Sequence, residues 1–245
     1  VWALRARIET LEGGDAVPAD DVAWSAVELR RQMRVLLVDE PLPTASRLTP
    51  GRWVELALSV AASADGESGL SVTAVTGSQL ASVAELEQAN AAVLLRPDTL
   101  GEVAWQRLSR RAEAGLVLLV TPPVDGRTTA WYGPMREAYA LPWRVEPEVV
   151  ELPQAATLSP SERPAEALAL LGGDLQELVQ PVKVQRMVSV EASGDSQWLA
   201  VALPEGEGSS PWMLHHTVDR GSVVLFASAF DASWTNVQTK PLFVP

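Results

Sequence analysis

Short aliphatic segments that alternate with amphipathic segments dominate the chain from Met33 to about Val120. Because a strand, a helix and a second strand of these lengths form a right-handed crossover between parallel strands, this alternation predicts a parallel sheet. Strands that are apolar along their whole length also predict helices on both faces of that sheet. The segments expected in this region are strands at 34–39, 70–75, 91–95 and 116–120, and helices at 52–62, 80–88 and 100–114.

The fold class predicted from this pattern is α/β, with a flavodoxin-like parallel sheet covered by helices on both faces. The strand at Arg34 is expected to be central, in an order 3-2-1-4 of the four strands. Residues 122–180 are expected to form an irregular insertion that contains a helical stretch at 165–171. Additional strands should extend the sheet in the carboxy-terminal part, at 182–190, 198–203, 213–218 and 222–227.

Residues 1–32 have the alternating pattern of a β-hairpin instead. Apolar and polar side chains alternate from Trp2 to Glu9, and a second such run extends from Val22 to Leu29. Because a lone hairpin is marginally stable in water, it should extend the following sheet or be the remnant of a preceding β-sandwich. Two regions are therefore expected, a hairpin at 1–32 and an α/β domain at 33–245.

Composition excludes several classes of function. The net charge of −12 argues against nucleic acid and against anionic lipid surfaces as partners, since both require clustered Lys and Arg. The chain contains no cysteine, which excludes disulfides, thiolate metal sites and a cysteine nucleophile. No P-loop, G-x-G-x-x-G or G-x-S-x-G motif is present, and we expect no cofactor and no metal.

The carboxy-terminal segment is apolar up to the last residue, and the first residue is Val1. We therefore expect the sequence to be the middle of a longer protein. Trp234 and Phe243 are expected to pack on the domain, because a linker would be richer in Gly, Ser and charge. Asp231 and Asn236 should then form turn hydrogen bonds to backbone groups.

Polar residues at the ends of the apolar strands are the candidate site. In an open α/β sheet the crevice at the strand carboxyl ends is where ligands bind. The residues expected to line it are Asp39, Glu40, Arg96, Asp98 and Thr121.

Two metal-binding motifs have partial matches. The acidic pair Asp39-Glu40 resembles the opening of a response-regulator receiver, but the Leu95 strand ends in Arg96, where that family has its phosphoacceptor. The segment from Asp231 to Thr235 fits D-x-S-x-T, the first part of a von Willebrand A metal site, yet only ten residues follow it. We interpret both as polar strand ends and turns.

The histidines are a third candidate for chemistry. His215 and His216 are the only two, and adjacent residues of a strand point to opposite faces. They are therefore expected to be packed or solvent-facing side chains, not joint ligands of one ion.

Two stretches of the chain together resemble a protein family. The turn at 15–21 leading into 34–39, and the tail with Gly221 to Ser228, Asp231, Trp234, Asn236 and 240–245, resemble the extracytoplasmic part of bacterial aerotolerance-type (BatA-like) membrane proteins. This resemblance implies a class I glutamine-amidotransferase-like fold before a final membrane helix. Active amidotransferases place a cysteine on the turn that corresponds to 120–123, where this chain has Val-Thr-Pro-Pro. The resemblance therefore implies a non-catalytic relative without glutaminase or amidase activity.

The function expected from these observations is a non-catalytic interaction or sensing module of a membrane-anchored bacterial envelope protein. Its partners would be other envelope or membrane proteins, its location would be extracytoplasmic, and its anchors would lie outside this sequence. The alternative is a small-molecule-binding or hydrolytic domain that uses the crevice at the strand ends.

Overall fold

A computed structural model describes two separate units of the chain, residues 1–32 and 33–245. The residues described are 2–7, 22–27, 33–40, 48–64, 69–161, 168, 171–192, 196–203 and 208–243. In the first unit, strand β1 (Trp2–Arg7) pairs antiparallel with β2 (Val22–Val27). The turn expected between them, and the end of the second run, lie outside the described residues.

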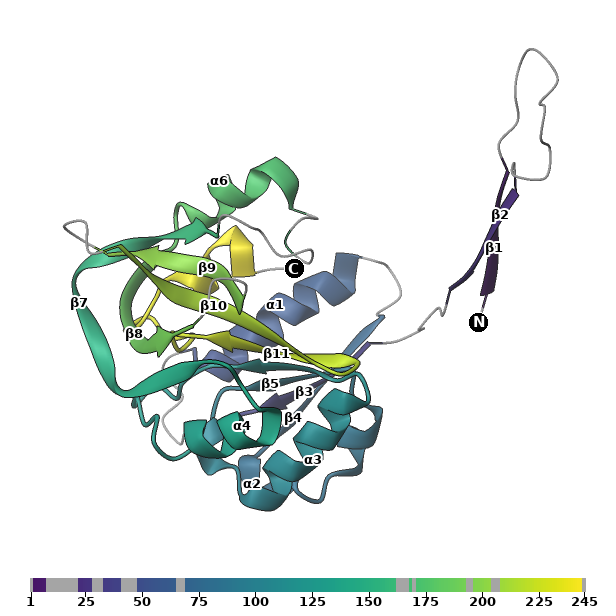
Figure 1. Cartoon of the computed structure of the whole chain (residues 1–245), viewed down its shortest axis with the longest axis horizontal. Coiled ribbons are helices and arrows are strands. Elements are labelled where there is room, and N and C mark those ends of the chain that lie inside the picture. The colour runs from purple at the N-terminus through teal and green to yellow at the C-terminus, as the bar shows by residue number, and fades with distance from the viewer. Residues whose placement is uncertain are drawn as a thin grey trace, which may run out of the picture. The chain divides into compact units, whose positions relative to one another are not determined.

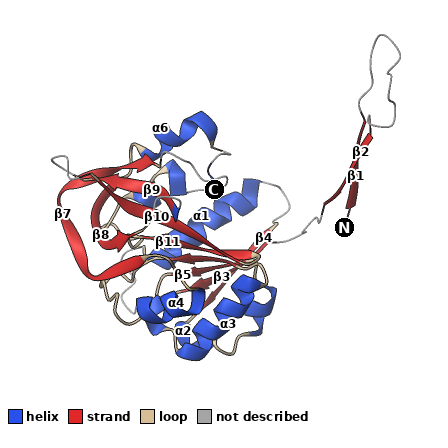
Figure 2. Ribbon diagram, in the orientation of Figure 1, coloured by secondary structure: helices blue, strands red, loops and turns tan. Residues whose placement is uncertain are grey.

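The second unit is built on one nine-stranded sheet (Figures 1 and 2). Five neighbouring strands are parallel to one another, and each of the other four is antiparallel to its neighbour. The order across the sheet is β4 (Leu70–Val75), β3 (Met33–Val38), β5 (Ala91–Leu94), β6 (Val117–Val120), β11 (Gly221–Phe226), β10 (Ser209–Val218), β9 (Gln197–Ala202), β7 (Arg144–Pro160) and β8 (Lys183–Glu191).

This arrangement corrects the expected fold class. The chain is α/β, but its sheet is mixed, so the expected flavodoxin-like or amidotransferase-like parallel sheet is wrong. The parallel part ends at β11, after which the chain segments that form β10, β9, β7 and β8 pair antiparallel. Antiparallel strands can be joined by tight turns, which is why β9, β10 and β11 follow one another without a helix between them.

The expected order 3-2-1-4 is also wrong, because the four strands stand in the order 2-1-3-4. The strand at Arg34 does lie inside the sheet, between β4 and β5. A right-handed crossover moves the chain in opposite directions depending on which face its helix covers. The first crossover uses α1 on one face and the second uses α2 on the other, so the chain returns past β3 (Figure 1).

Helices cover the two faces of the sheet unequally (Figure 1). Helices α2, α3 and α4 lie on one side, which we call the three-helix face, and α1 and α6 lie on the other, the α1 face. The helix expected at 80–88 is interrupted after Leu80. The helical segments are α1 (Pro50–Ala64), α2 (Gly77–Leu80), η1 (Ala84–Gln88), η2 (Pro97–Thr99), α3 (Glu102–Glu113), α4 (Tyr132–Tyr139), η3 (Gly172–Asp174), α6 (Leu175–Val179), η6 (Val237–Thr239) and η7 (Pro241–Phe243).

The expected irregular insertion at 122–180 contains more regular structure than its sequence indicates. Its main element is β7, a strand of 17 residues that pairs with both β8 and β9. The ladder with β8 shifts register around Pro147 and again around Pro153, since proline cannot donate a backbone hydrogen bond. These prolines are what hide the strand in the sequence. Of the helical stretch expected at 165–171, only Leu168 and Leu171 are among the described residues.

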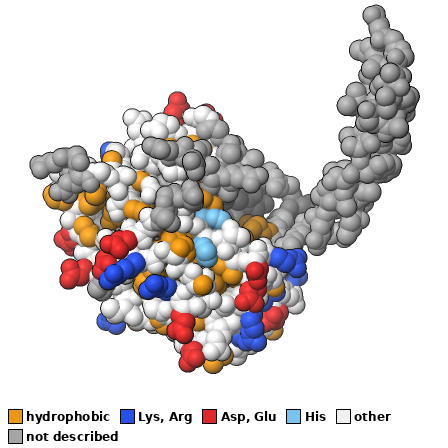
Figure 3. Space-filling model, in the orientation of Figure 1, with side chains coloured by type: hydrophobic (Ala, Val, Ile, Leu, Met, Phe, Trp, Pro, Cys, Tyr) orange, Lys and Arg blue, Asp and Glu red, His pale blue; other side chains and the backbone are white. Residues whose placement is uncertain are grey.

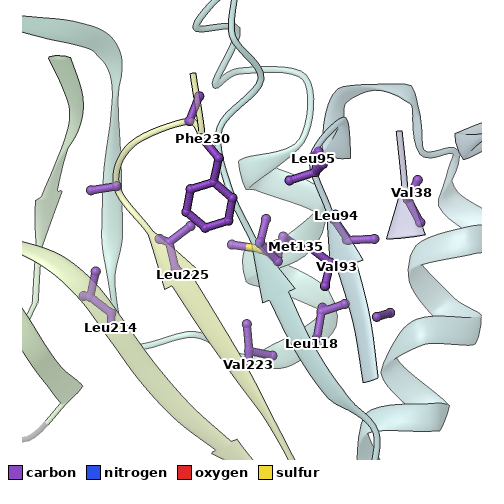
Figure 4. Close-up of a cluster of buried hydrophobic side chains, with 14 of the residues drawn as sticks. Val38, Val93, Leu94, Leu95, Leu118, Met135, Leu214, Val223, Leu225 and Phe230 are labelled. Atoms are coloured by element: carbon purple, nitrogen blue, oxygen red, sulfur yellow. The ribbon is translucent and has the colours of Figure 1, made fainter. Parts of the chain in front are cut away.

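Aliphatic side chains of the central strands are fully buried on the three-helix face. Leu94, Leu118, Val223 and Leu225 are fully buried there, next to Met135 of α4 (Figure 4). Large aromatic side chains fill much of the remaining interior. Those almost completely buried are Trp105, Trp131, Trp143, Trp212 and Trp234.

The carboxy-terminal segment packs on the domain, which confirms the expectation for its aromatic residues. Trp234 is fully buried and donates a hydrogen bond from Nε1 to the carbonyl of Val124 at 3.0 Å. Phe243 contacts Phe230 edge to face, with ring centroids 5.0 Å apart. Among the described residues, no helix is both long enough and apolar enough to cross a lipid bilayer.

Asp231 forms the predicted turn hydrogen bonds, whereas Asn236 bonds to the backbone of a distant segment instead of a turn. Asp231 Oδ1 accepts hydrogen bonds from the backbone N–H and the hydroxyl of Ser233. Asn236 Oδ1 accepts one from the Lys183 N–H at 2.7 Å. These contacts close the D-x-S-x-T segment against the domain.

Candidate functional site

The acidic pair after β3 lies at the start of two helices. Asp39 accepts hydrogen bonds from the Glu40 N–H at 2.9 Å and from the Gly51 N–H, in the first turn of α1, at 3.2 Å. The first N–H groups of a helix lack partners within the helix, so a carboxylate there satisfies one of them and interacts favourably with the helix dipole. A Cβ on Gly51 would come within 2.2 Å of Asp39 Oδ2, so the contact requires glycine.

Burial raises the pKa of Asp39 above that of an ordinary aspartate. The two backbone hydrogen bonds and the charge of Arg96 oppose this rise without cancelling it. A carboxyl group that is harder to ionise is a feature of many functional sites, but also of buried structural carboxylates.

Glu40 has the same structural role for the next helix. Its Oε1 accepts a hydrogen bond from the Gly77 N–H, at the start of α2, at 3.2 Å. Thr76 and Gln79 complete the helix start with a capping box. Asp39 and Glu40 thus connect the end of β3 to the amino-terminal ends of α1 and α2.

Arg96 and Asp98 pair with each other after β5. The guanidinium donates two hydrogen bonds to the carboxylate, Nε to Oδ1 at 2.9 Å and Nη2 to Oδ2 at 2.8 Å. The Asp98 side chain is 7% exposed and the Arg96 side chain 27%. Hydrogen bonding to Asp98 raises the pKa of Arg96, and the charges of Asp125 and Glu40 contribute. The Arg96 cation therefore lies in the field of several acidic groups.

Thr121 differs from the other four because it is buried, with 1% of its surface exposed. Its backbone N–H donates to the Leu94 carbonyl at 3.0 Å and so extends the pairing of β5 and β6. Two buried prolines, Pro122 and Pro123, follow it. Proline has no N–H, so these two positions provide no backbone donor for an oxyanion.

The structure brings four of the five expected residues into one charged cluster but does not place all five in one crevice. A hollow of 340 Å³ beside the amino-terminal end of α1 has Asp39 in its wall, together with Thr49, Arg52, Glu55 and Thr76. Glu40, Arg96, Asp98 and Thr121 do not line that hollow. The cluster is therefore mainly a set of helix-capping and ion-pair contacts, with a shallow polar hollow at one side.

The two histidines lie on opposite faces of β10, as expected. His215 stacks on Trp198, with ring centroids 4.5 Å apart, and burial lowers its pKa. His216 meets Trp143 edge to face at 6.3 Å. Each histidine is thus packed against a tryptophan.

A second cavity, larger than the hollow beside Asp39 and not predicted from the sequence, lies on the α1 face. It has a volume of 390 Å³ and extends beneath α1 toward the carboxy-terminal segment. Residues that line it include Ala57, Val93, Leu119, Met213, Phe226 and Phe243. We call this cavity the apolar trough. The strand sequences alone do not reveal it, because the same aliphatic residues would be expected beneath a helix.

No family model and no curated protein matches the chain. Similar solved structures include two from Salmonella typhimurium. Cytoplasmic protein STM1381 has 15% identity and a TM-score of 0.60, with 82% of this chain and 90% of that chain covered. Cytoplasmic protein STM3548 has 12% identity and a TM-score of 0.61, with 86% and 94% covered.

A β-galactosidase from Rahnella sp. R3 is also similar, with 16% identity and a TM-score of 0.58. The alignment covers 87% of this chain but only 30% of the enzyme chain. At these identities the similarities concern the fold alone. None of these three proteins is described as a flavodoxin or an amidotransferase.

Proposed function

We propose that this chain is an enzymatically inactive interaction or sensing module of a membrane-anchored bacterial envelope protein. The proposal that the chain is not catalytic is supported by one observation: the polar groups at the strand ends are engaged in structural contacts. Asp39 and Glu40 accept hydrogen bonds from helix starts, and Arg96 is held by both oxygens of Asp98. A catalytic acid or base needs a free position next to a substrate, whereas these groups already have structural partners.

The envelope location rests on the resemblance of the hairpin turn and the tail to aerotolerance-type membrane proteins. Two structural neighbours are described as cytoplasmic proteins, which makes a cytoplasmic location the competing hypothesis. The location is testable on the intact reading frame with an epitope inserted after Gly173, an exposed position. We expect the epitope in the membrane fraction and accessible to protease in spheroplasts. Recovery in the soluble cytoplasmic fraction would contradict the proposal.

The absence of catalysis is testable with a panel of simple substrates. Purified protein should release no ammonia from glutamine and no nitrophenol from nitrophenyl esters or β-galactosides above a heat-inactivated control. The Asp39→Asn and Thr121→Ala variants should behave identically to the parent. Turnover that either substitution abolishes, with the melting temperature retained, would establish an enzyme.

A second candidate function is small-molecule binding or hydrolysis at the strand ends. The hollow of 340 Å³ beside Asp39 favours it, since it combines a carboxyl group of raised pKa with the hydroxyl-bearing residues Thr49 and Thr76. This function would be supported by a ligand that raises the melting temperature of the parent protein but not that of the Asp39→Asn variant.

A further inference from the structure

The two faces of the sheet are closed to different extents at its centre. On the three-helix face, Leu118, Val223 and Leu225 are fully buried beneath the helices. On the α1 face of the same strands, Leu119 and Phe226 are only half-buried. Helix α1 covers the part of that face near β4, and the carboxy-terminal segment covers the part near β10. The apolar trough lies between these two segments, and Leu168 and Leu171 also line it.

The lining of the trough is chemically uniform. Each described residue that lines it has an apolar side chain, and the indole N–H of Trp212 is its one strong hydrogen-bonding group. That N–H donates to Ser228 Oγ at 2.9 Å and is therefore already satisfied. A stable internal water needs two to four polar partners, so the described side chains of the trough offer ordered water no site. An apolar molecule suits this space better than solvent.

A β-bulge contributes to the lining. Pro211 pairs with Ala200 and Met213 with Leu199, so Trp212 is an extra residue in β10. Through this irregularity the consecutive side chains of Trp212 and Met213 both line the trough, whereas neighbours in a regular strand point to opposite faces.

The trough is long relative to its volume. It extends across the strands from Leu70 in β4 to Leu199 in β9, the seventh strand along the sheet. At about 4.8 Å per strand, these strands span roughly 25 to 30 Å. A single acyl chain is about 15 Å long, half the hydrocarbon thickness of a bilayer. A volume of 390 Å³ distributed along such a path fits an extended chain better than a compact ring system.

We propose that the apolar trough binds one single-chain amphiphile, such as a free fatty acid, with its alkyl chain across the strands. Half-buried His215 lies on the same face as Met213, two residues further along β10, and hydrophobic side chains reach the surface around the histidines (Figure 3). The net charge of −12 disfavours an anionic bilayer as the occupant, because a bilayer surface presents many negative charges and a single fatty acid only one. This inference goes beyond the proposed function and is independent of where the protein resides.

The test measures, by calorimetry, the binding of saturated fatty acids of 8, 10, 12 and 16 carbons to the complete protein chain. Each acid is used below its micelle concentration. Affinity should rise about fourfold for each added methylene up to the 16-carbon acid, because an acyl chain of about 15 Å is shorter than the trough. At a free concentration 100 times the Kd, the melting temperature should rise by roughly 5 to 10 °C. 1-Adamantanol, a compact apolar alcohol, should bind more weakly than the 10-carbon acid.

Three variants locate the site. Ala57→Phe fills the trough from α1, and Met213→Asp places a charge in its wall, so both should weaken binding of the 16-carbon acid at least tenfold. Val103→Asp changes an exposed apolar residue on α3, on the opposite side of the sheet, and should bind like the parent. The melting temperature of each unliganded variant identifies any that fails to fold, and Ala57→Phe keeps the test valid if Met213→Asp does not fold.

Three results would overturn the inference. One is equal affinity for all four chain lengths, or no binding at all. Another is binding to phosphatidylethanolamine and phosphatidylglycerol vesicles without binding of free fatty acid, which would indicate a membrane surface. The last is a dimer that Met213→Asp dissociates, which would indicate that a second copy covers the trough. Each of these results would contradict only the ligand inference. The location and turnover tests of the proposed function would remain valid.

Discussion

Replacement of Trp234 by alanine should destabilise the whole α/β unit. The side chain is fully buried, donates a hydrogen bond to the Val124 carbonyl at 3.0 Å, and lies under the Arg186 guanidinium at 5.0 Å. Truncation of a buried tryptophan to alanine costs about 3 to 5 kcal/mol. In a protein of this size 1 kcal/mol lowers the melting temperature by about 2 to 4 °C, so we expect a decrease of about 6 to 20 °C.

Trp234→Phe separates packing from hydrogen bonding. It keeps most of the ring volume but leaves the Val124 carbonyl without its donor, a loss of about 1 to 3 kcal/mol. Trp53→Ala, at a half-buried position on α1, is the control and should have a smaller effect than Trp234→Ala. Melting is followed by circular dichroism and by calorimetry.

Deletion of everything after Ala229 provides an independent check on the same segment. It removes Trp234 and Phe243 together and should lower the melting temperature at least as much as Trp234→Ala, whereas EDTA should leave the parent unchanged. If Trp234→Ala and the truncated chain both melt within about 2 °C of the parent, the tail does not contribute to the core and the reasoning fails.

Two further predictions concern single positions. Because the pKa of Asp39 is raised in the folded state, its ionisation opposes folding, and stability from this group is lost as pH rises through the folded pKa. The melting temperature of Asp39→Asn relative to the parent should therefore increase from pH 3.5 to 7 in thermal scans, and a constant difference would contradict the burial argument. A Cβ at Gly221 would lie 2.3 Å from the carbonyl oxygens of Ala112 and Leu116, so Gly221→Ala should cost about 1 to 3 kcal/mol or more in urea unfolding. Gly133→Ala in α4 meets no atom within 4 Å and should be neutral or slightly stabilising; equal effects at the two glycines would refute the steric explanation.

Local sequence patterns were sufficient for most individual elements. The strands at 34–38, 70–75 and 91–94 and the helices α1 and α3 agree with the predicted segments, because period and apolar content reflect local burial. Strand β7 was missed because its prolines indicate a turn locally, while its pairing partners β8 and β9 come later in the chain. Whether such a segment forms a strand depends on pairing partners that are distant in the sequence.

The candidate site likewise combines features that local sequence patterns predict with features that depend on distant contacts. The sequence placed Asp39, Glu40, Arg96 and Asp98 at strand ends, where parallel topology gathers polar residues. Arg96 and Asp98 are only two residues apart, so their ion pair is a local contact. By contrast, Asp39 and Glu40 accept hydrogen bonds from helix N–H groups 12 and 37 residues away in the sequence. No local pattern contains that information.

Strand order and the apolar trough were decided by tertiary structure alone. The sequence determined that crossovers occur and that they are right-handed, but the face on which each helix packs sets the direction of the next strand. In the structure, α2, α3 and α4 all lie on one face, so α1 covers the other face together with α6 and the carboxy-terminal segment. The aliphatic residues of β6 and β11 are compatible with a helix on either side. Leu119 and Phe226 are half-buried because of where α1 and the carboxy-terminal segment pack on the sheet. The burial of a strand face depends on what packs against it.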